Sequence, residues 1–362
     1  MPKNPFKFLD SFEKKDIDRF FGRTKETAQL FNAVHASNLV MIYGASGTGK
    51  TSLVMCGLAN KFHDTDWLPV FIRRGSDINA SIQRELKVQL PDHISSKHGI
   101  RELIHELYLE HYKPVYLIFD QFEELYILGN EKEQNAFHQE IGDLLKSELN
   151  CKILIIFREE YLASLSEFEK VVPSLFDNRL RIEKMNRLNL RKVILGTARW
   201  GKIEVVEPKK TIPAIFDNLF VKREGIDLTN LQVYLDHLWR KDAERQGAST
   251  DEEILKLEKI TYDLPLVDSV GAMQYVISEF IDHKLKDIET ALAKQDNTNI
   301  VAGLPLEILF TMVTEDGTKR SMDKKSILKY VPKYFNLSEK VLDYCLKEFK
   351  RLRLLRELVD AE

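Results

Sequence analysis

Residues 44–51 form the pattern G-x-x-x-x-G-K-[ST], which is typical of a loop that binds the phosphates of a nucleotide. Its glycines let backbone N–H groups point at a triphosphate, Lys50 can reach the β- and γ-phosphates, and the Thr51 hydroxyl can bind Mg²⁺. The residues expected to bind the nucleotide here are Gly44, Ala45, Ser46, Gly47, Thr48, Gly49, Lys50, Thr51 and Ser52. A chance turn is the alternative, but the apolar run 39–43 before the loop and the helical stretch 51–62 after it favour a nucleotide site.

Acidic residues follow a second apolar run, where they could hold a metal and direct a water molecule. Residues 115–119 read as a buried strand, and Asp120 at its carboxyl end would bind Mg²⁺ directly or through water. Glu123 or Glu124 could orient or deprotonate the attacking water, and position slightly favours Glu124. An exposed acidic turn would look similar, but a separation of about seventy residues from the loop favours a Walker B strand.

A third apolar run ends in a positive charge. Residues 152–157 read as a strand beside the Walker B strand, and Arg158 follows it. Because ligands of open parallel sheets bind at the carboxyl ends of the strands, Arg158 could face the γ-phosphate and report its presence. Surface pairing of Arg158 with Glu159 or Glu160 is an equally good interpretation.

Alternating strands and helices must position these groups. Further strands are predicted over 67–72 and around 179–182, and helices over 24–36, 77–90 and 99–112. This alternation predicts an α/β fold with a parallel sheet flanked by helices. Phe21 and Gly22 precede the first helix and could form a purine pocket or an ordinary hydrophobic hinge.

Composition bounds the class of protein. A chain of 362 residues with 44% apolar residues should form two or three globular domains. Its three cysteines have no metal-site spacing, so we expect them to be reduced and buried. Apolar runs stay well below the roughly 18 residues of a membrane span, and no secretory leader is visible, so we expect a cytoplasmic protein without a membrane partner.

Helical spacing dominates beyond about residue 195, where the strand signal fades. Residues 228–239 predict a helix and 245–252 a loop, and the last hundred residues predict further helices over 272–292, 305–314 and 323–330 and one capped by Ser338. Residues 352–359 read as the start of a strand. The domains expected are a P-loop nucleotide-binding domain over 1–195, a small helical domain over 196–250, and a helical or winged-helix domain over 251–362 that ends before its last strand.

Charge is unevenly spread along the chain. The formal net charge is −3, whereas residues 319–356 contain 12 Lys and Arg against 4 Asp and Glu. Such a segment could bind nucleic acid, but a solvated face or a surface that docks on the acidic remainder is the simpler interpretation.

The motifs together resemble the STAND signalling NTPases, and among them the bacterial branch called novel STAND NTPase 1. The resemblance rests on Asn4-Pro5-Phe6, Phe20-Phe21-Gly22-Arg23, the loop 44–53, Asp120-Gln121-Phe122-Glu123-Glu124-Leu125 and Phe157-Arg158-Glu159-Glu160-Tyr161-Leu162. It implies that Phe21, Gly22 and Arg23 lie at the adenine side and that Arg158 senses the γ-phosphate. Relatives carry a nucleotide-contacting proline where this chain has Thr229, and a histidine beyond the wing that has no counterpart here.

The resemblance implies an ATP- or ADP-operated switch that binds Mg²⁺, hydrolyses ATP slowly, and forms a homo-oligomer when activated. Bacterial defence, cell death or signalling is the implied setting, with a trigger or effector that acts through a C-terminal region lacking here. A DNA-binding transcription regulator that uses the basic segment is the alternative, although few base-reading side chains lie there. A constitutive ATPase motor is a third interpretation.

Overall fold

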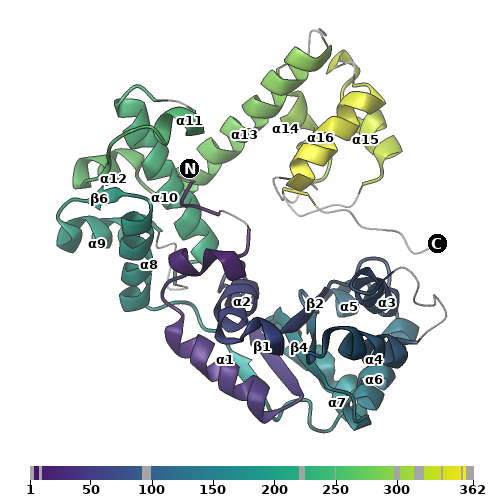
Figure 1. Ribbon diagram of the computed structural model, residues 1–362. Helices are drawn as coiled ribbons and strands as arrows, with labels where there is room; N and C mark the ends of the chain where they lie inside the picture. Colours follow the sequence, from purple (N-terminus) through teal and green to yellow (C-terminus); the bar gives the residue numbers. More distant parts are fainter. Residues whose placement is uncertain are drawn as a thin grey trace. The chain divides into compact units, whose positions relative to one another are not determined.

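A parallel sheet of five strands is the framework of the first part of the chain (Figure 1). The computed structural model describes residues 4–7, 10–91, 99–219, 225–248, 250–296, 302–313, 322–335, 337–351 and 354–355. The strands are β1 (Leu39–Gly44), β2 (Leu68–Ile72), β3 (Val115–Phe119), β4 (Cys151–Arg158) and β5 (Arg179–Arg181). Their order in the sheet is β2-β3-β4-β1-β5, and every neighbouring pair is parallel. The predicted strands and the α/β fold class are confirmed.

Helices cover both faces of this sheet, which explains the continuous apolar runs. All five residues of β3 are buried, as expected for a central strand. Leu117 and Phe119 belong to the core cluster on one face, and Tyr116 and Ile118 to the cluster on the other. The helices of this part are α1 (Thr24–Ala36), α2 (Lys50–Ser52), α3 (Ile78–Val88), α4 (Ile100–His111), α5 (Glu124–Leu128), α6 (Glu131–Lys146) and α7 (Ser166–Val171).

The two faces are covered by different helices. Helix α1 and the turns that continue α2 to residue 61 pack on one face, and α3, α4, α6 and α7 pack on the other. Residues 53–58 of that continuation form a π-helix, so the predicted helix after the loop is irregular rather than uniform.

Helices dominate the chain after the sheet, as predicted. They are α8 (Arg187–Trp200), α9 (Pro208–Leu219), α10 (Leu228–Arg245), α11 (Asp251–Ile254) and α12 (Leu264–Val270). Two short strands, β6 (Ile203–Val205) and β7 (Ile260–Tyr262), form a parallel pair that the sequence did not indicate. Three residues are too few to show a strand period, and tertiary packing holds them: the buried Tyr262 donates from its hydroxyl to the Leu235 carbonyl at 2.6 Å. The loop expected over 245–252 is shorter than predicted, since α11 starts at Asp251.

The chain divides into two compact units, with the boundary between Ser269 and Val270. Both the nucleotide-binding domain expected over 1–195 and the small helical domain expected over 196–250 belong to the first unit. The predicted boundaries at residues 195 and 250 therefore stay predictions.

The second unit is helical in its described residues and has its own core. It contains α13 (Met273–Asp296), α14 (Leu304–Phe310), α15 (Lys324–Tyr330) and α16 (Glu339–Arg351). The Ser338 hydroxyl accepts a hydrogen bond from the Val341 N–H at 3.3 Å, as the predicted cap requires. The strand expected over 352–359 lies outside the described residues except for Leu354 and Leu355, which are not in a strand, so the winged helix stays a prediction.

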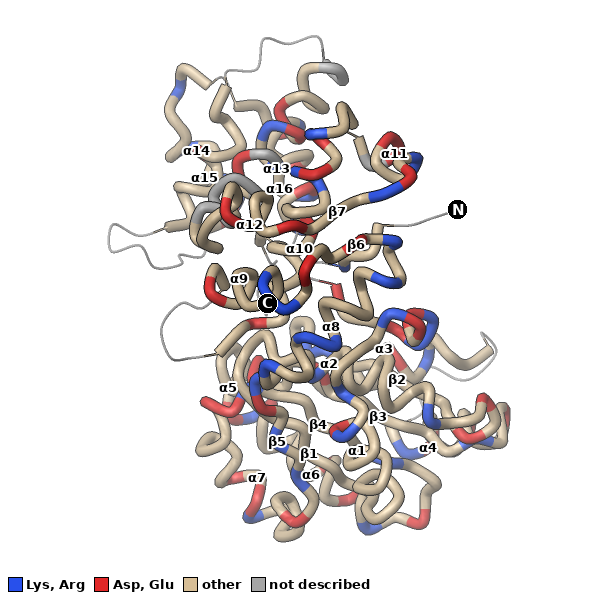
Figure 2. Tube along the Cα trace, turned by 90° about the vertical axis from the view of Figure 1, so that its left-hand side faces the viewer, with Lys and Arg blue, Asp and Glu red and all other residues tan. Residues whose placement is uncertain are grey.

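Two expectations from composition concern the whole chain. Cys56, Cys151 and Cys345 are free and buried, as predicted. No helix in the described ranges is both long and apolar enough to cross a bilayer. Positive and negative residues are interspersed over the helices that cover the sheet (Figure 2), which is typical of solvated helix faces.

Candidate nucleotide-binding site

The carboxyl edge of the sheet brings the predicted site residues together. Parallel strands end at the same edge, so β1 delivers the loop that begins at Gly44, β3 delivers Asp120, and β4 delivers Arg158. Because β4 lies between β1 and β3, Arg158 emerges between the loop and Asp120. This edge is where open α/β sheets bind their ligands.

The loop itself has the backbone that its glycines permit. Gly47 and Gly49 have φ of +70° and +84°, a left-handed conformation that strains other residues. The Lys50 ammonium donates to the carbonyls of Gly44 and Ala45, both at 2.8 Å, and so closes the loop on itself. Burial lowers the pKa of Lys50, and the nearby Glu123 opposes that shift.

Thr51 and Asp120 form a pair of oxygen ligands that suits Mg²⁺. The Thr51 hydroxyl donates to Asp120 Oδ1 at 2.8 Å, and Asp120 is only 5% exposed. A hydroxyl and a carboxylate are hard oxygen donors, and Mg²⁺ bound with a nucleotide takes few ligands from the protein. Among the described residues there is no cluster of three or more His, Cys, Asp or Glu side chains that could hold a metal ion.

Glu123 and Glu124 are both buried, and Glu123 contacts Arg158. Glu123 accepts the Arg158 backbone N–H at 3.2 Å, and its Oε1 lies 3.4 Å from Arg158 Nε. Burial raises the pKa of Glu123, against the attraction of Arg158 and Lys50. Glu124 begins α5 and is 3% exposed.

The Arg158 side chain pairs with Glu123, and not with Glu159 or Glu160, the two neighbours in sequence that were its alternative partners. Its side chain is half exposed, and Glu159 instead pairs with Arg181 at 2.8 Å. Arg158 therefore touches a residue of the Walker B turn while much of its side chain remains accessible.

Phe21, Gly22 and Arg23 connect the loop to α8. Arg23 is buried and donates to the carbonyls of Thr48 at 2.7 Å and Glu183 at 2.9 Å, so it braces the loop from behind. A methyl group on Gly196 of α8 would lie 2.6 Å from the Phe21 ring, and Gly22 packs against the side chains of Met185 and Val193. The predicted adenine side is thus lined by α8 as well as by the N-terminal motif.

Helix α10 also reaches the loop, through a residue that sequence reasoning missed. The Leu228 N–H donates to the Gly47 carbonyl at 3.1 Å, and a Cβ on Gly47 would lie 1.7 Å from Asp227 Oδ2. Asp227 Oδ1 accepts the Thr229 N–H at 2.7 Å and so caps α10. A proline at position 229 would remove that donor, so the departure from the family pattern has a structural role here. An Asp just before a helical run was the available signal.

The N-terminal segment ties the loop's helix to α10. The Ser52 hydroxyl accepts the Phe12 N–H at 3.0 Å, and Gln232 of α10 accepts the Lys7 N–H at 3.3 Å. The segment is itself held by the buried Asp16, which contacts Lys7 and also pairs with Arg19 at 2.6 Å. These contacts link the phosphate loop to the helical region at two points.

Arg73 is the second residue that the sequence analysis missed. It follows β2, and both its Nη2 at 2.6 Å and its Nε at 3.1 Å donate to Asp120 Oδ2. A charged residue directly after a strand could have indicated it, but the adjacency of β2 and β3 appears only in the fold.

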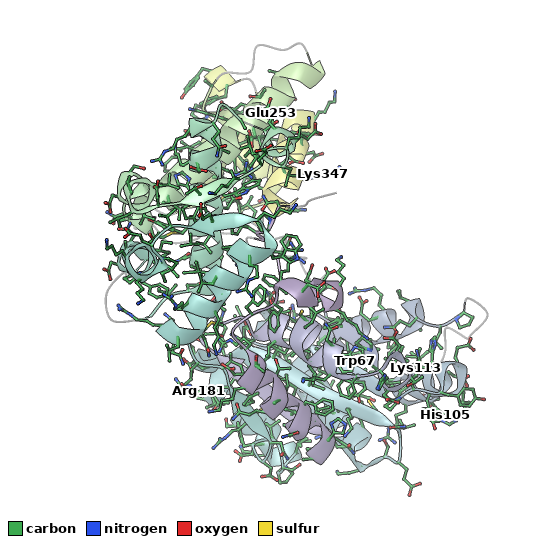
Figure 3. All side chains as sticks on the ribbon, turned by 60° about the vertical axis from the view of Figure 1, so that its left-hand side comes forward. Trp67, His105, Lys113, Arg181, Glu253 and Lys347 are labelled. Carbon is green, nitrogen blue, oxygen red and sulfur yellow. The ribbon has the colours of Figure 1, made fainter. Side chains whose placement is uncertain are left out.

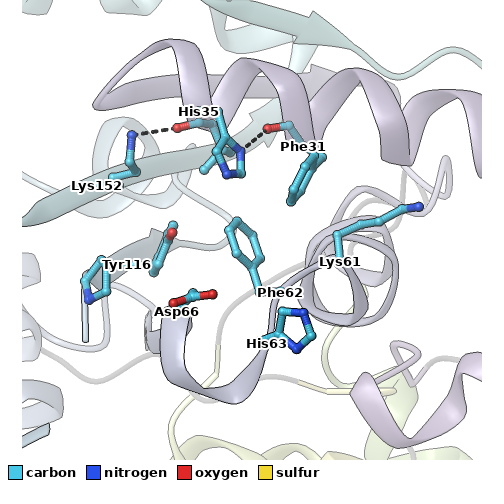
Figure 4. A pocket seen from close by; sticks show the side chains of 10 residues that line it. Phe31, His35, Lys61, Phe62, His63, Asp66, Tyr116 and Lys152 are labelled. Atoms are coloured by element: carbon cyan, nitrogen blue, oxygen red, sulfur yellow. Dashed lines mark hydrogen bonds between the residues drawn. The ribbon is translucent and has the colours of Figure 1, made fainter. Parts of the chain in front are cut away.

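A pocket of about 390 Å³ lies at the opposite, amino edge of the sheet and is separate from this site (Figure 4). Phe31, His35, Phe62 and Tyr116 line it, and the Lys152 ammonium there donates to the Val34 carbonyl at 2.7 Å. Trp67 and Lys113 precede the adjacent strands β2 and β3 at this edge (Figure 3).

Comparisons with known proteins bear on the family and the fold. The profile of the family described as Novel STAND NTPase 1 matches residues 5–343. No curated protein matches the chain in sequence.

Solved structures share the fold at low identity. The ORC1 protein of Aeropyrum pernix in complex with DNA is 17% identical, with a TM-score of 0.51 over 93% of this chain and 84% of that one. The ORC2 protein of the same organism, with ADPNP and ADP, is 14% identical, with a TM-score of 0.52 over 96% and 100%. A Walker-type ATPase of Pyrococcus abyssi is 13% identical, with a TM-score of 0.50 over 96% and 93%.

Proposed function

The chain belongs to the novel STAND NTPase 1 family, and from that premise we propose that it is a switch operated by ATP and ADP. In this proposal Mg-ATP binds at the carboxyl edge of the sheet, hydrolysis is slow, and exchange of ADP for ATP frees the protein to form a homo-oligomer. We place its role in bacterial defence, cell death or signalling within the cytoplasm. A ligand can shift such an equilibrium only by its different affinity for the two states.

One observation carries the proposal: the start of α10 rests on the phosphate loop. Leu228 donates to the Gly47 carbonyl, and Asp227 lies against the Gly47 backbone. A polyphosphate in the loop would place negative charge close to the Asp227 carboxylate, so occupancy of the loop and the position of α10 are energetically linked. This link supports a switch more directly than it supports a constitutive motor.

The side chains divide the work of binding. Lys50 and the loop N–H groups would hold the phosphates, Arg23 would keep the loop in shape, and Thr51 with Asp120 would hold Mg²⁺. The metal would supply charge neutralisation on the β- and γ-phosphate oxygens. Arg158, half exposed at the neighbouring strand end, is our candidate for sensing the γ-phosphate.

Glu123 is our candidate for the residue that orients the attacking water. It contacts Arg158 and is attracted by the charge of Lys50, and a pKa raised by burial brings a carboxylate nearer to the range in which a general base is effective. This assignment differs from the slight preference for Glu124 that chain position suggested.

The nucleotide content of the purified protein tests the proposal. Denaturing the chain and chromatographing the supernatant should release ADP or ATP in about equimolar amount, because a switch retains its ligand. Lys50→Ala should bind ATP at least about a hundredfold more weakly in calorimetry, since an ammonium and its charge-assisted hydrogen bonds are lost. Unchanged ATP affinity in this variant would refute the role of the loop.

DNA binding by the basic segment 319–356 remains the alternative function. Part of that segment lies outside the described residues, and the solved ORC1 complex with DNA bears on the fold alone. A gel shift with duplex DNA over a range of salt concentrations distinguishes the two functions, because phosphate contacts give a steep salt dependence.

A further inference from the structure

Arg73 and Asp120 meet because of strand register. Strands β2 and β3 are parallel neighbours, with Ile72 opposite Phe119, and the Asp120 N–H donates to the Ile72 carbonyl at 2.9 Å. The next residue of each strand therefore leaves the sheet at the same level of the carboxyl edge. Arg73 and Asp120 therefore lie side by side and form an ion pair.

The ion pair uses the oxygen of Asp120 that Thr51 does not. Thr51 donates to Oδ1, whereas Arg73 donates to Oδ2 through both Nε and Nη2. Both oxygens of the Walker B carboxylate are thus occupied by donors from this chain. A bound Mg²⁺ with its waters needs the same hydroxyl and the same carboxylate.

Exposure shows which partner can leave. The Arg73 side chain is 51% exposed and that of Asp120 is 5% exposed, so Arg73 can swing into water whereas Asp120 stays in place. Arg74, the next residue, is buried and pairs with Glu133 at 2.6 Å on a different side of the chain. The two adjacent arginines therefore have separate roles, one structural and one at the edge.

We propose that Arg73 competes with Mg²⁺ for the Asp120 carboxylate and so sets how strongly nucleotide binding depends on magnesium. The inference rests on the proposed Mg-nucleotide site. Two cations beside one carboxylate repel each other, so loading the metal requires Arg73 to loosen its hold. Without the metal, Arg73 shields the phosphates from the negative charge of Asp120. Arg73 is thus a positioning residue that acts through Asp120.

The test measures binding rather than turnover. Dissociation constants of a fluorescent N-methylanthraniloyl ADP are determined by anisotropy in EDTA and in excess Mg²⁺. The dissociation constant in EDTA divided by that in Mg²⁺ gives the magnesium dependence. In Arg73→Gln the ratio should rise about tenfold over the parent, because a half-exposed charged hydrogen bond no longer opposes the metal. Arg73→Lys keeps the charge, is less disruptive to the fold, and should raise the ratio by a smaller factor.

Arg181→Gln is the matched control. Arg181 is 55% exposed, is the last residue of β5 at the same edge of the sheet (Figure 3), and pairs with Glu159 instead of Asp120. Its removal takes away the same charge and should leave the ratio unchanged. Asp120→Asn should bring the ratio close to one.

The outcomes distinguish failure of the nucleotide site from failure of the competition at Asp120. If the parent binds no nucleotide, or binds it no more tightly than Lys50→Ala does, the proposed function fails. If the parent binds nucleotide but the ratio in Arg73→Gln is unchanged or lower, the competition is refuted while the site stands. If Arg73→Gln instead loses affinity for Mg-ADPNP more than for Mg-ADP, Arg73 contacts the γ-phosphate and the competition is again refuted.

Discussion

At the scale of single residues, the charges of the site are held in a closed set of contacts. Lys50 binds carbonyls of its own loop, Asp120 is shared by Thr51 and Arg73, and Glu123 is paired with Arg158. A nucleotide must exchange some of these contacts for its own. Lys50 and Arg73 would release their present partners, whereas the buried Asp120 would stay in place.

The two glutamates of the Walker B turn can be separated by their effect on turnover. We expect Glu123→Gln to lower the rate of ATP hydrolysis about a hundredfold with ATP affinity nearly unchanged, because the amide keeps a hydrogen-bond acceptor but cannot take a proton. Single-turnover hydrolysis together with calorimetry measures both quantities. Glu124→Gln is the matched variant, and a larger loss there would return the role to Glu124.

At the scale of elements, α10 is the helix whose start contacts the loop. Its N-terminal contacts with Gly47 sit beside the contacts of the N-terminal segment with Ser52 and Gln232. Hydrogen bonds connect the loop, α10 and the N-terminal segment, so movement of one of them would disturb its hydrogen bonds to the other two.

The contact between Gly47 and Asp227 predicts a coupled pair of substitutions. Gly47→Ala introduces a Cβ that overlaps the Asp227 carboxylate and strains a φ of +70°, so we expect a loss of about 2–3 kcal/mol in the free energy of unfolding. Asp227→Ala alone should cost about 1 kcal/mol through the lost helix cap. The double variant should lose less than the sum, as measured by urea denaturation. Strict additivity would mean that the two residues do not touch.

At the scale of the whole molecule, stability should depend on pH through a buried histidine. Burial lowers the pKa of His138 to about 4, although Glu167 opposes the shift. The His138 ring stacks on Phe168, and its Nε2 lies 3.1 Å from the Tyr126 hydroxyl. The folded chain therefore keeps this imidazole neutral well below the pH at which the unfolded chain protonates it.

The sign of the effect follows from that difference. Above about pH 6.5 the imidazole is neutral in both states, and between about pH 6.5 and 4 only the unfolded state takes the proton, so the free energy of unfolding falls by up to about 3 kcal/mol. Below about pH 4 this contribution no longer changes. His138→Phe should flatten the fall between those values in chemical denaturation experiments, and an identical pH profile in the variant would contradict the assignment.

Much of the fold could be read from the sequence because local signals agree there. The run at 115–119 matches β3 in both bounds, and the spacing at 24–36 matches α1. Strands β6 and β7 were missed because three residues show no period, and they are held by their pairing and by packing of β6 against α8 and of β7 against α10. Ser338 was correctly predicted as a cap because its hydrogen bond is local.

The sequence alone determined the kind of chemistry, since the loop's glycines, Lys50 and Thr51 are contiguous and their spacing is a local property of the chain. Only the tertiary structure decided which distant charges meet. Arg73 reaches Asp120 because β2 and β3 are neighbours, and Asp227 reaches Gly47 because α10 docks on the loop. Strand order and helix docking depend on contacts between residues far apart in the chain, and no short pattern of residue types encodes them.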